Sequence, residues 1–168
     1  MKERIKSLVP YLLIIVVIVF IKIFIVTPIK VNGESMEPTL HPKDIMILNK
    51  SAYYFSDPKR FDIVVISMPN EYLIKRVIGL PGENIKYIDN TLYVDGEKIE
   101  EPISGLETDD FDIEELGATE VPFDSYLVLG DNRDNSLDSR ELGFISKDQI
   151  LGKATFIILP FSRFGGIS

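Results

Sequence analysis

The sequence predicts a mainly β protein: a single N-terminal transmembrane helix followed by an antiparallel β-sheet domain with a small β-hairpin lobe. The first observation is one long apolar run, over 8–27, behind a basic N-terminus. The second is a series of short apolar segments after this run, separated by Gly, Pro, Asn and Asp, which is typical of strands and turns. The third is the composition, 45% hydrophobic without cysteine, which suits one packed core and excludes disulfides.

The apolar run from Leu8 to Val26 is interrupted only by Lys22, and its roughly 19 residues would span about 28 Å as a helix. Lys22 lies near the far end, where its ammonium group can reach the interface. The basic residues of segment 1–7 predict a cytoplasmic N-terminus, so residues 28–168 are expected outside the cell membrane. A cleaved signal peptide is the alternative, but its apolar region is shorter and ends at a small-residue site.

The net charge of −8 is unevenly distributed along the chain. The first 27 residues carry +3 and the remainder carries −11, which argues against nucleic acid as a partner. The absence of cysteine excludes a thiol nucleophile, and the single histidine, His41, excludes a cluster of histidine ligands. His41 precedes Pro42 and is interpreted as a surface-loop residue. We therefore expect neither a metal nor another cofactor.

Six apolar segments predict the strands of the main sheet: Ile29–Asn32, Asp44–Asn49, Asp62–Ser67, Tyr72–Leu80, Ser125–Gly130 and Lys153–Leu159. The turn residues 68–71 predict that the third and fourth segments form a hairpin.

An insert at about 82–122 is predicted to form the small lobe. Asp89-Asn90 and Asp95-Gly96 separate alternating segments within 85–99, which indicates two successive hairpins. Segment 106–120 holds seven acidic residues and no basic one, and we expect a mobile loop there.

A serine and a lysine are the candidate catalytic residues. Ser35 lies in the short loop Gly33-Glu34-Ser35-Met36-Glu37-Pro38, and Lys75 lies within the apolar segment 73–80. A serine hydroxyl needs a base to become a nucleophile, and burial lowers the pKa of a lysine so that it can act as that base. We therefore expect Ser35 and Lys75 to meet as a dyad for peptide hydrolysis.

Structural interpretations of the same residues stay open on this reasoning. Lys75 can be a solvent-facing lysine on an edge strand, and Ser35 can be a turn serine that bonds to nearby backbone. The polar segment 131–140 can be a hydrogen-bonded corner. Strand alternation places Arg76 on the face opposite to Lys75, where it requires an acidic partner, and Asp131 is the candidate.

Three motifs in this order resemble those of the bacterial type I signal peptidases, in the short form found in Gram-positive bacteria. Ser35-Met36-x-Pro38-Thr39-Leu40 is similar to the nucleophile motif of that family. The motif that holds the general base is similar to Lys75-Arg76-Val77-Ile78-Gly79-Leu80-Pro81-Gly82-Glu83. The third motif is similar to Gly130-Asp131-Asn132-Arg133-Asp134-Asn135-Ser136-Leu137-Asp138-Ser139-Arg140.

The resemblance implies a role for each matching residue. Ser35 is the nucleophile, Lys75 the general base, and Ser136 orients the lysine amine. The remaining pairs support the site: Asp138 with Arg140, and Asp131 with Arg76.

The resemblance also implies a substrate site. Shallow pockets for small substrate residues at −1 and −3 would have these wall candidates: Ile29, Val31, Leu40, Leu73 and Ile74. The Ser35 backbone N–H is one oxyanion donor. Gly33 stands where some relatives have a serine donor, which excludes a side-chain donor at that position.

The implied function is that of a membrane-anchored serine endopeptidase that removes N-terminal signal peptides from exported preproteins through an acyl-enzyme. Its partners would be those preproteins and the lipid bilayer, and we expect a monomer without metal or cofactor. Two rivals are a self-cleaving serine–lysine repressor, which needs a DNA-binding domain that the apolar N-terminus does not supply, and a membrane-tethered β domain that binds without catalysis.

Overall fold

The computed structural model describes residues 11–19, 22, 25–103, 105 and 107–167, and within these residues 11–19 and 22 are helical. Among the residues described, no helix is long and apolar enough to cross a membrane. Segment 1–7 and residues 8–10, 20–21 and 23–24 of the apolar run lie outside the described residues. At its end the run differs from the expectation, because strand β1 already begins at Val26.

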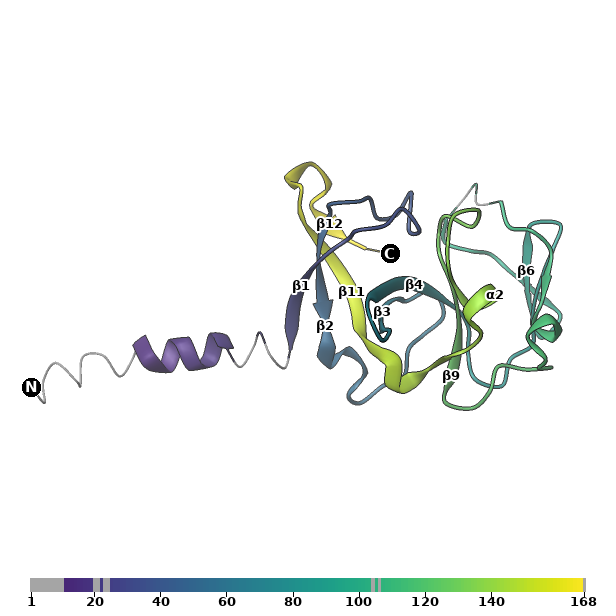
Figure 1. The fold of residues 1–168 in the computed structure, drawn as a ribbon, viewed down its shortest axis with the longest axis horizontal. Helices are drawn as coiled ribbons and strands as arrows, with labels where there is room; N and C mark the ends of the chain where they lie inside the picture. Colours follow the sequence, from purple (N-terminus) through teal and green to yellow (C-terminus); the bar gives the residue numbers. More distant parts are fainter. Residues whose placement is uncertain (1–10, 20–21, 23–24, 104, 106, 168) are drawn as a thin grey trace, which may run out of the picture.

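Among the described residues, eight strands form a curved antiparallel sheet in the order β1-β2-β11-β3-β4-β9-β10, with β12 added beside β11 (Figure 1). Its strands have these bounds: β1 Val26–Lys30, β2 Ile45–Asn49, β3 Ile63–Ser67, β4 Tyr72–Gly79, β9 Ser125–Leu129, β10 Ile145–Ser146, β11 Ile150–Leu159 and β12 Gly165–Gly166. All six predicted strands and the β3–β4 hairpin are confirmed, with boundary shifts of a few residues. The short helices between them are η1 Lys50–Tyr53, α2 Ser139–Leu142, η3 Lys147–Gln149 and η4 Phe161–Arg163.

The insert forms a second sheet of four strands among the described residues, in the order β7-β6-β5-β8. Its elements are β5 Ile85–Ile88, β6 Thr91–Val94, β7 Glu97–Ile99, β8 Phe111–Asp112 and helix η2 Ile113–Leu116. The two predicted hairpins are confirmed. The interpretation of 106–120 as a mobile loop is wrong where β8 pairs with β5. Phe111 and Ile113 are buried there, so the burial of alternate apolar residues fixes this segment in spite of the acidic residues around it.

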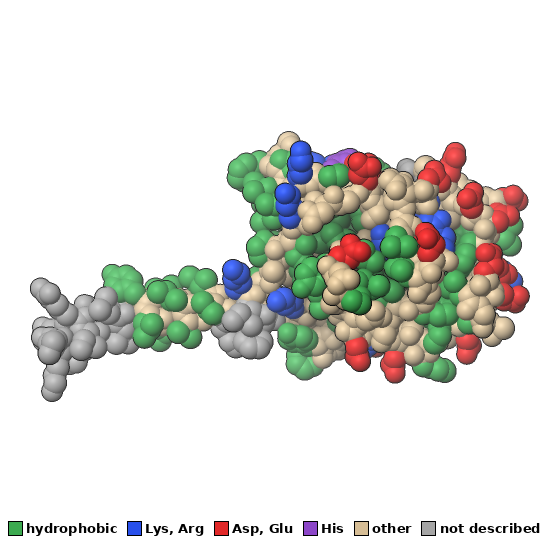
Figure 2. Space-filling view, in the orientation of Figure 1, with side chains coloured by type: hydrophobic (Ala, Val, Ile, Leu, Met, Phe, Trp, Pro, Cys, Tyr) green, Lys and Arg blue, Asp and Glu red, His purple; other side chains and the backbone are tan. Residues whose placement is uncertain are grey.

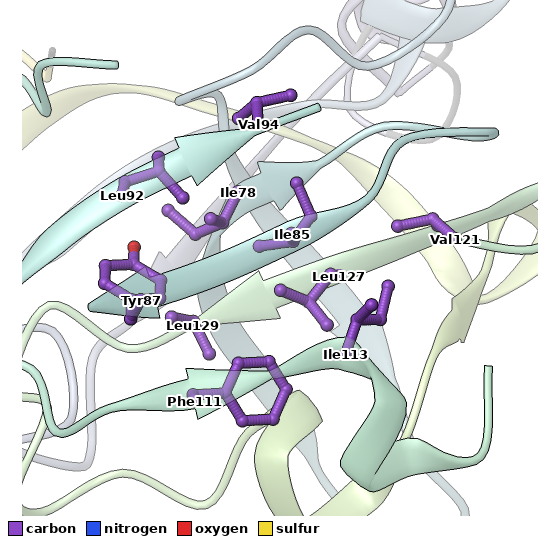
Figure 3. Packing of buried hydrophobic residues seen from close by; sticks show 10 residues of the cluster. All are labelled: Ile78, Ile85, Tyr87, Leu92, Val94, Phe111, Ile113, Val121, Leu127 and Leu129. Atoms are coloured by element: carbon purple, nitrogen blue, oxygen red, sulfur yellow. The ribbon is translucent and has the colours of Figure 1, made fainter. Parts of the chain in front are cut away.

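One hydrophobic core joins the small lobe to the large sheet (Figure 3). Ile78 of β4 and Leu127 and Leu129 of β9 point into the lobe and pack in one cluster with its buried residues, which include Tyr87 and Phe111. Two further clusters cover the two faces of β3 and β4. The lobe is therefore packed directly onto the strands that carry the candidate site.

Charged side chains are separated along the molecule. On the face in Figure 2, acidic side chains gather over the small lobe, and most Lys and Arg side chains gather at the end beside the N-terminal helix. The helix itself, over Tyr11–Val19, exposes apolar side chains throughout.

Candidate active site

Ser35 lies on a turn that the core holds from one side and the third motif from the other. Met36 and Leu40 are fully buried, and the Leu40 N–H donates to the Met36 carbonyl over 2.8 Å. On the opposite side, the Ser35 carbonyl accepts from the Asn132 N–H over 3.0 Å. Ser35 itself stays partly exposed. The loop therefore presents the hydroxyl-bearing residue at the surface while its neighbours are anchored.

Lys75 is only 2% exposed, on a central strand that pairs on both sides. The edge-strand interpretation is wrong, because β4 lies between β3 and β9. The Lys75 backbone is opposite Val64, which belongs to one of the buried clusters. The Lys75 Nζ donates to the Ser136 Oγ over 3.0 Å.

Burial lowers the pKa of Lys75 from its usual 10.5 to about 8, partly opposed by the negative charge of Asp138 and assisted by the positive charge of Arg140. At this pKa about one amine in ten is neutral at pH 7, against about one in a few thousand for an ordinary lysine. The environment therefore suits a lysine that acts as a general base near neutral pH.

Gly130 is where the Ser35 turn and the third motif meet. A Cβ atom at this position would lie 2.1 Å from the Ser136 Oγ and 2.5 Å from the Ser35 carbonyl oxygen, which is closer than atoms can approach. Only glycine allows this contact. Ser136 thus contacts Lys75 on one side and Gly130 on the other, and the Ser35 backbone contacts the same glycine.

The predicted supporting pairs form as ion pairs. Arg76 donates from Nε and Nη2 to the two oxygens of Asp131, each over 2.9 Å, and both side chains are buried. Arg140 donates to Asp138 over 3.0 Å, and Asp138 also accepts from the Gly130 N–H over 3.0 Å. Burial would raise the pKa of Asp138, but the bonds from Arg140 and Gly130 bring the pKa below its ordinary value.

A groove of about 670 Å³ leads to Ser35 between the end of β1 with its following loop and the β3–β4 hairpin. Four of the predicted wall residues line it: Ile29, Val31, Leu73 and Ile74. The prediction that Leu40 is a wall residue is wrong, because Leu40 is fully buried in the core and does not line the groove. It follows Ser35 by five residues and packs in the buried cluster under the turn, whereas Met36 of the same turn lines the groove.

Arg133 is a residue of the third motif to which the sequence assigned no role. Its side chain is buried and bonds to three residues of the small lobe: Tyr87, Glu101 and Thr108. A buried arginine needs acceptors, but only the structure shows that Arg133 is buried. These partners lie 25 or more residues away in the chain, and no spacing rule connects them to Arg133.

The chain is similar in sequence and in structure to known signal peptidases. A family model described as "Signal peptidase, peptidase S26" matches residues 1–159. A "Signal peptidase I" of Bacillus amyloliquefaciens is 42% identical over 161 residues, covering 89% of this chain and 84% of that protein. A "Signal peptidase IB" of Staphylococcus aureus is 36% identical, covering 97% and 93%. A crystal structure of a signal peptidase I from Enterococcus faecalis aligns with a TM-score of 0.53 and 38% identity, over 58% of this chain and 97% of that one.

Proposed function

The chain belongs to the signal peptidase S26 family, and we propose that it cleaves preproteins by a serine–lysine dyad formed by Ser35 and Lys75. Membership in this family makes it a serine hydrolase of the signal peptidase I type, which removes signal peptides from preproteins. The observation that carries the dyad is the buried Lys75 amine, bonded to Ser136 beside the glycine that the Ser35 turn contacts.

In the proposed reaction, neutral Lys75 takes the proton of the Ser35 hydroxyl as its oxygen attacks the carbonyl carbon of the substrate residue at −1. The Ser35 N–H donates to the oxyanion. The C–N bond breaks, the leaving amine takes the proton from Lys75, and the leader remains as an ester on Ser35. Lys75 then deprotonates a water molecule that hydrolyses this ester, and the proton returns to Ser35.

The substrate binds in the groove as an added strand in this proposal. β1 is an edge strand of the large sheet, so its outer backbone groups are available to an extended peptide beside residues 29–33. The apolar walls are Ile29, Val31, Leu73 and Ile74, and they leave room for small side chains at −1 and −3.

Membrane anchoring belongs to the same proposal. The apolar run 8–27 would span the cytoplasmic membrane once, with residues 1–7 inside the cell and the peptidase domain outside, working as a monomer. The exposed apolar side chains of Tyr11–Val19 and the basic end in Figure 2 support it. An anchor raises the concentration of enzyme near substrates that the membrane also holds.

Cleavage of a purified preprotein in detergent micelles tests the dyad. We expect Ser35→Ala and Lys75→Ala to lower kcat/KM at least 1,000-fold, since each removes one partner of the proton transfer. Wild-type kcat/KM should rise with pH through a midpoint near 8 and level off about one pH unit higher, where Lys75 is mostly neutral. Circular dichroism checks folding, and the exposed residues Ser56 and Lys98 serve as matched alanine controls.

Two outcomes would contradict the proposal. Retained activity in folded Lys75→Ala would place the base elsewhere. If folded wild type cuts none of several preproteins, the tethered binding domain is the better interpretation.

A further inference from the structure

Arg133 connects the small lobe to the loop that carries the third motif. Its side chain is buried, although it begins on a polar turn. Its Nη1 donates to the Tyr87 hydroxyl over 3.0 Å and to the Thr108 hydroxyl over 2.6 Å. Its Nη1 and Nη2 also donate to the two oxygens of Glu101, which forms an ion pair with it. The small lobe therefore holds the guanidinium group through three side chains.

Arg133 also contacts the core of the candidate site, once through its side chain and once through its backbone. The Arg133 Nε donates to the Gly130 carbonyl over 2.9 Å, and the Arg133 carbonyl accepts from the Arg140 Nη2 over 2.6 Å. Gly130 is the residue against which Ser136 and the Ser35 backbone pack. Arg133 is thus bonded directly to both ends of the arrangement around Lys75, through Gly130 and through Arg140.

We propose that Arg133, held by Glu101 of the small lobe, is a positioning residue that sets the geometry of Ser136, Ser35 and Lys75. This inference rests on the proposed dyad. The small lobe then has a part in the reaction without touching the substrate, because it supplies the anchor for the loop that orients the general base.

The chemistry of the pair explains why no other contact replaces it. An arginine guanidinium binds a carboxylate through a planar fork, which fixes direction as well as distance. Both side chains are largely shielded from water, so water does not take over lost bonds. Displacements of about 1 Å around reacting groups can cost about 100-fold in rate, which makes such an anchor matter for kcat.

The pKa of Lys75 depends on its surroundings, so it can report whether Arg133 holds the loop 130–140 in place. The charged groups that act on Lys75 are Asp138, Arg140, Asp131 and Glu71. The first three belong to the loop 130–140, and Glu71 belongs to the β3–β4 hairpin. Loosening the loop would admit water to the Lys75 amine and relieve its desolvation, which is the largest cause of the lowered pKa, so this pKa should rise toward its usual value. Displacement of Arg140 would add to this rise, and displacement of Asp138 and Asp131 would oppose it.

The test compares Glu101→Gln with Glu100→Gln in the full chain in detergent micelles. Both changes remove one negative charge from adjacent residues, but Glu100 is exposed and Glu101 is mostly shielded and bonded to Arg133. We expect kcat for preprotein cleavage to fall about tenfold in Glu101→Gln, with KM within twofold of wild type. The pH midpoint of kcat/KM should move upward by about half a unit. Glu100→Gln should match wild type.

Arg133→Lys gives the second variant. It keeps the charge and loses the fork, so it should show the same fall in kcat and the same upward midpoint. The inference is wrong if folded Glu101→Gln and Arg133→Lys retain wild-type kcat. It is also wrong if their activity falls only in proportion to the folded fraction while the pH midpoint stays in place.

The outcome separates this inference from the proposed function. If wild type and Glu100→Gln cleave, Ser35→Ala is inactive and Glu101→Gln equals wild type, the dyad stands and the positioning role fails. If folded Ser35→Ala still cleaves, the dyad itself fails.

Discussion

Lys75 shows at the scale of one residue how a site trades stability for reactivity. The amine is buried among apolar strands and donates a hydrogen bond to Ser136. Burial disfavours the charged form, so the folded chain holds this proton less tightly than the unfolded chain does. The lowered pKa that suits a general base is therefore also a cost to folding at neutral pH.

The variant Lys75→Met tests this cost. The pKa falls from 10.5 in the unfolded chain to about 8 in the folded one, equivalent to about 3 kcal/mol. This penalty is fully present below about pH 8, where both the folded and the unfolded chain carry the proton. It shrinks as pH rises toward 10.5, because the unfolded chain then loses the proton that had favoured it. We expect Lys75→Met to be inactive, yet up to about 3 kcal/mol more stable than wild type at pH 7.

Urea unfolding of both proteins at pH 7 and pH 10 measures the difference. The stability advantage of Lys75→Met should shrink at the higher pH. An advantage of the same size at both pH values would show that Lys75 is not desolvated in the folded chain.

Strand β1 determines at the scale of one element how substrate can be recognised. It pairs with β2 on one side only and continues into the groove wall at Val31. The groove runs between this edge and the β3–β4 hairpin, and it ends at Ser35. Main-chain bonding along β1 would hold any extended peptide, so only the walls select its side chains.

Backbone N-methylation of a leader-peptide substrate tests this mode of binding. In a bound strand, alternate N–H groups point toward the neighbouring strand. We therefore expect methylation at one of two adjacent substrate positions to raise KM about fivefold, equivalent to a lost bond of about 1 kcal/mol. Methylation at the adjacent position should leave KM nearly unchanged. Equal effects at both positions would argue against strand addition.

The two sheets act as one folding unit at the scale of the whole molecule. The lobe core includes Ile78, Leu127 and Leu129 of the large sheet (Figure 3). The Arg133–Glu101 pair crosses the same junction. Removing the lobe would expose these apolar side chains and take from Arg133 its bonds to Tyr87, Glu101 and Thr108.

A single cooperative transition is therefore expected when the domain unfolds. In calorimetry with detergent present, the measured enthalpy of unfolding should equal the van't Hoff enthalpy. Tyrosine fluorescence and far-UV circular dichroism should also give the same midpoint. Two separated transitions would show that the lobe folds by itself.

Local patterns were sufficient for the strands and for the residue types of the site. Alternation and turn residues predicted the β3–β4 hairpin and the two hairpins of the lobe, because pleating and turn geometry depend on neighbours in the chain. Alternation also placed Arg76 opposite to Lys75 and toward an acidic partner, and the Arg76–Asp131 pair forms. The local charge pattern misled at 106–120, where two buried apolar residues form part of a sheet.

The sequence by itself determined the mainly β class, the order of the strands along the chain, and the candidates Ser35, Lys75 and Ser136. The tertiary structure decided that Lys75 is buried on a central strand, that Leu40 belongs to the core, and that Gly130 is the contact between two distant loops. It alone revealed that Glu101 holds Arg133. Burial and contact depend on which strands lie side by side, and pairs such as β4 with β9 join residues about 50 positions apart, beyond the reach of any local pattern.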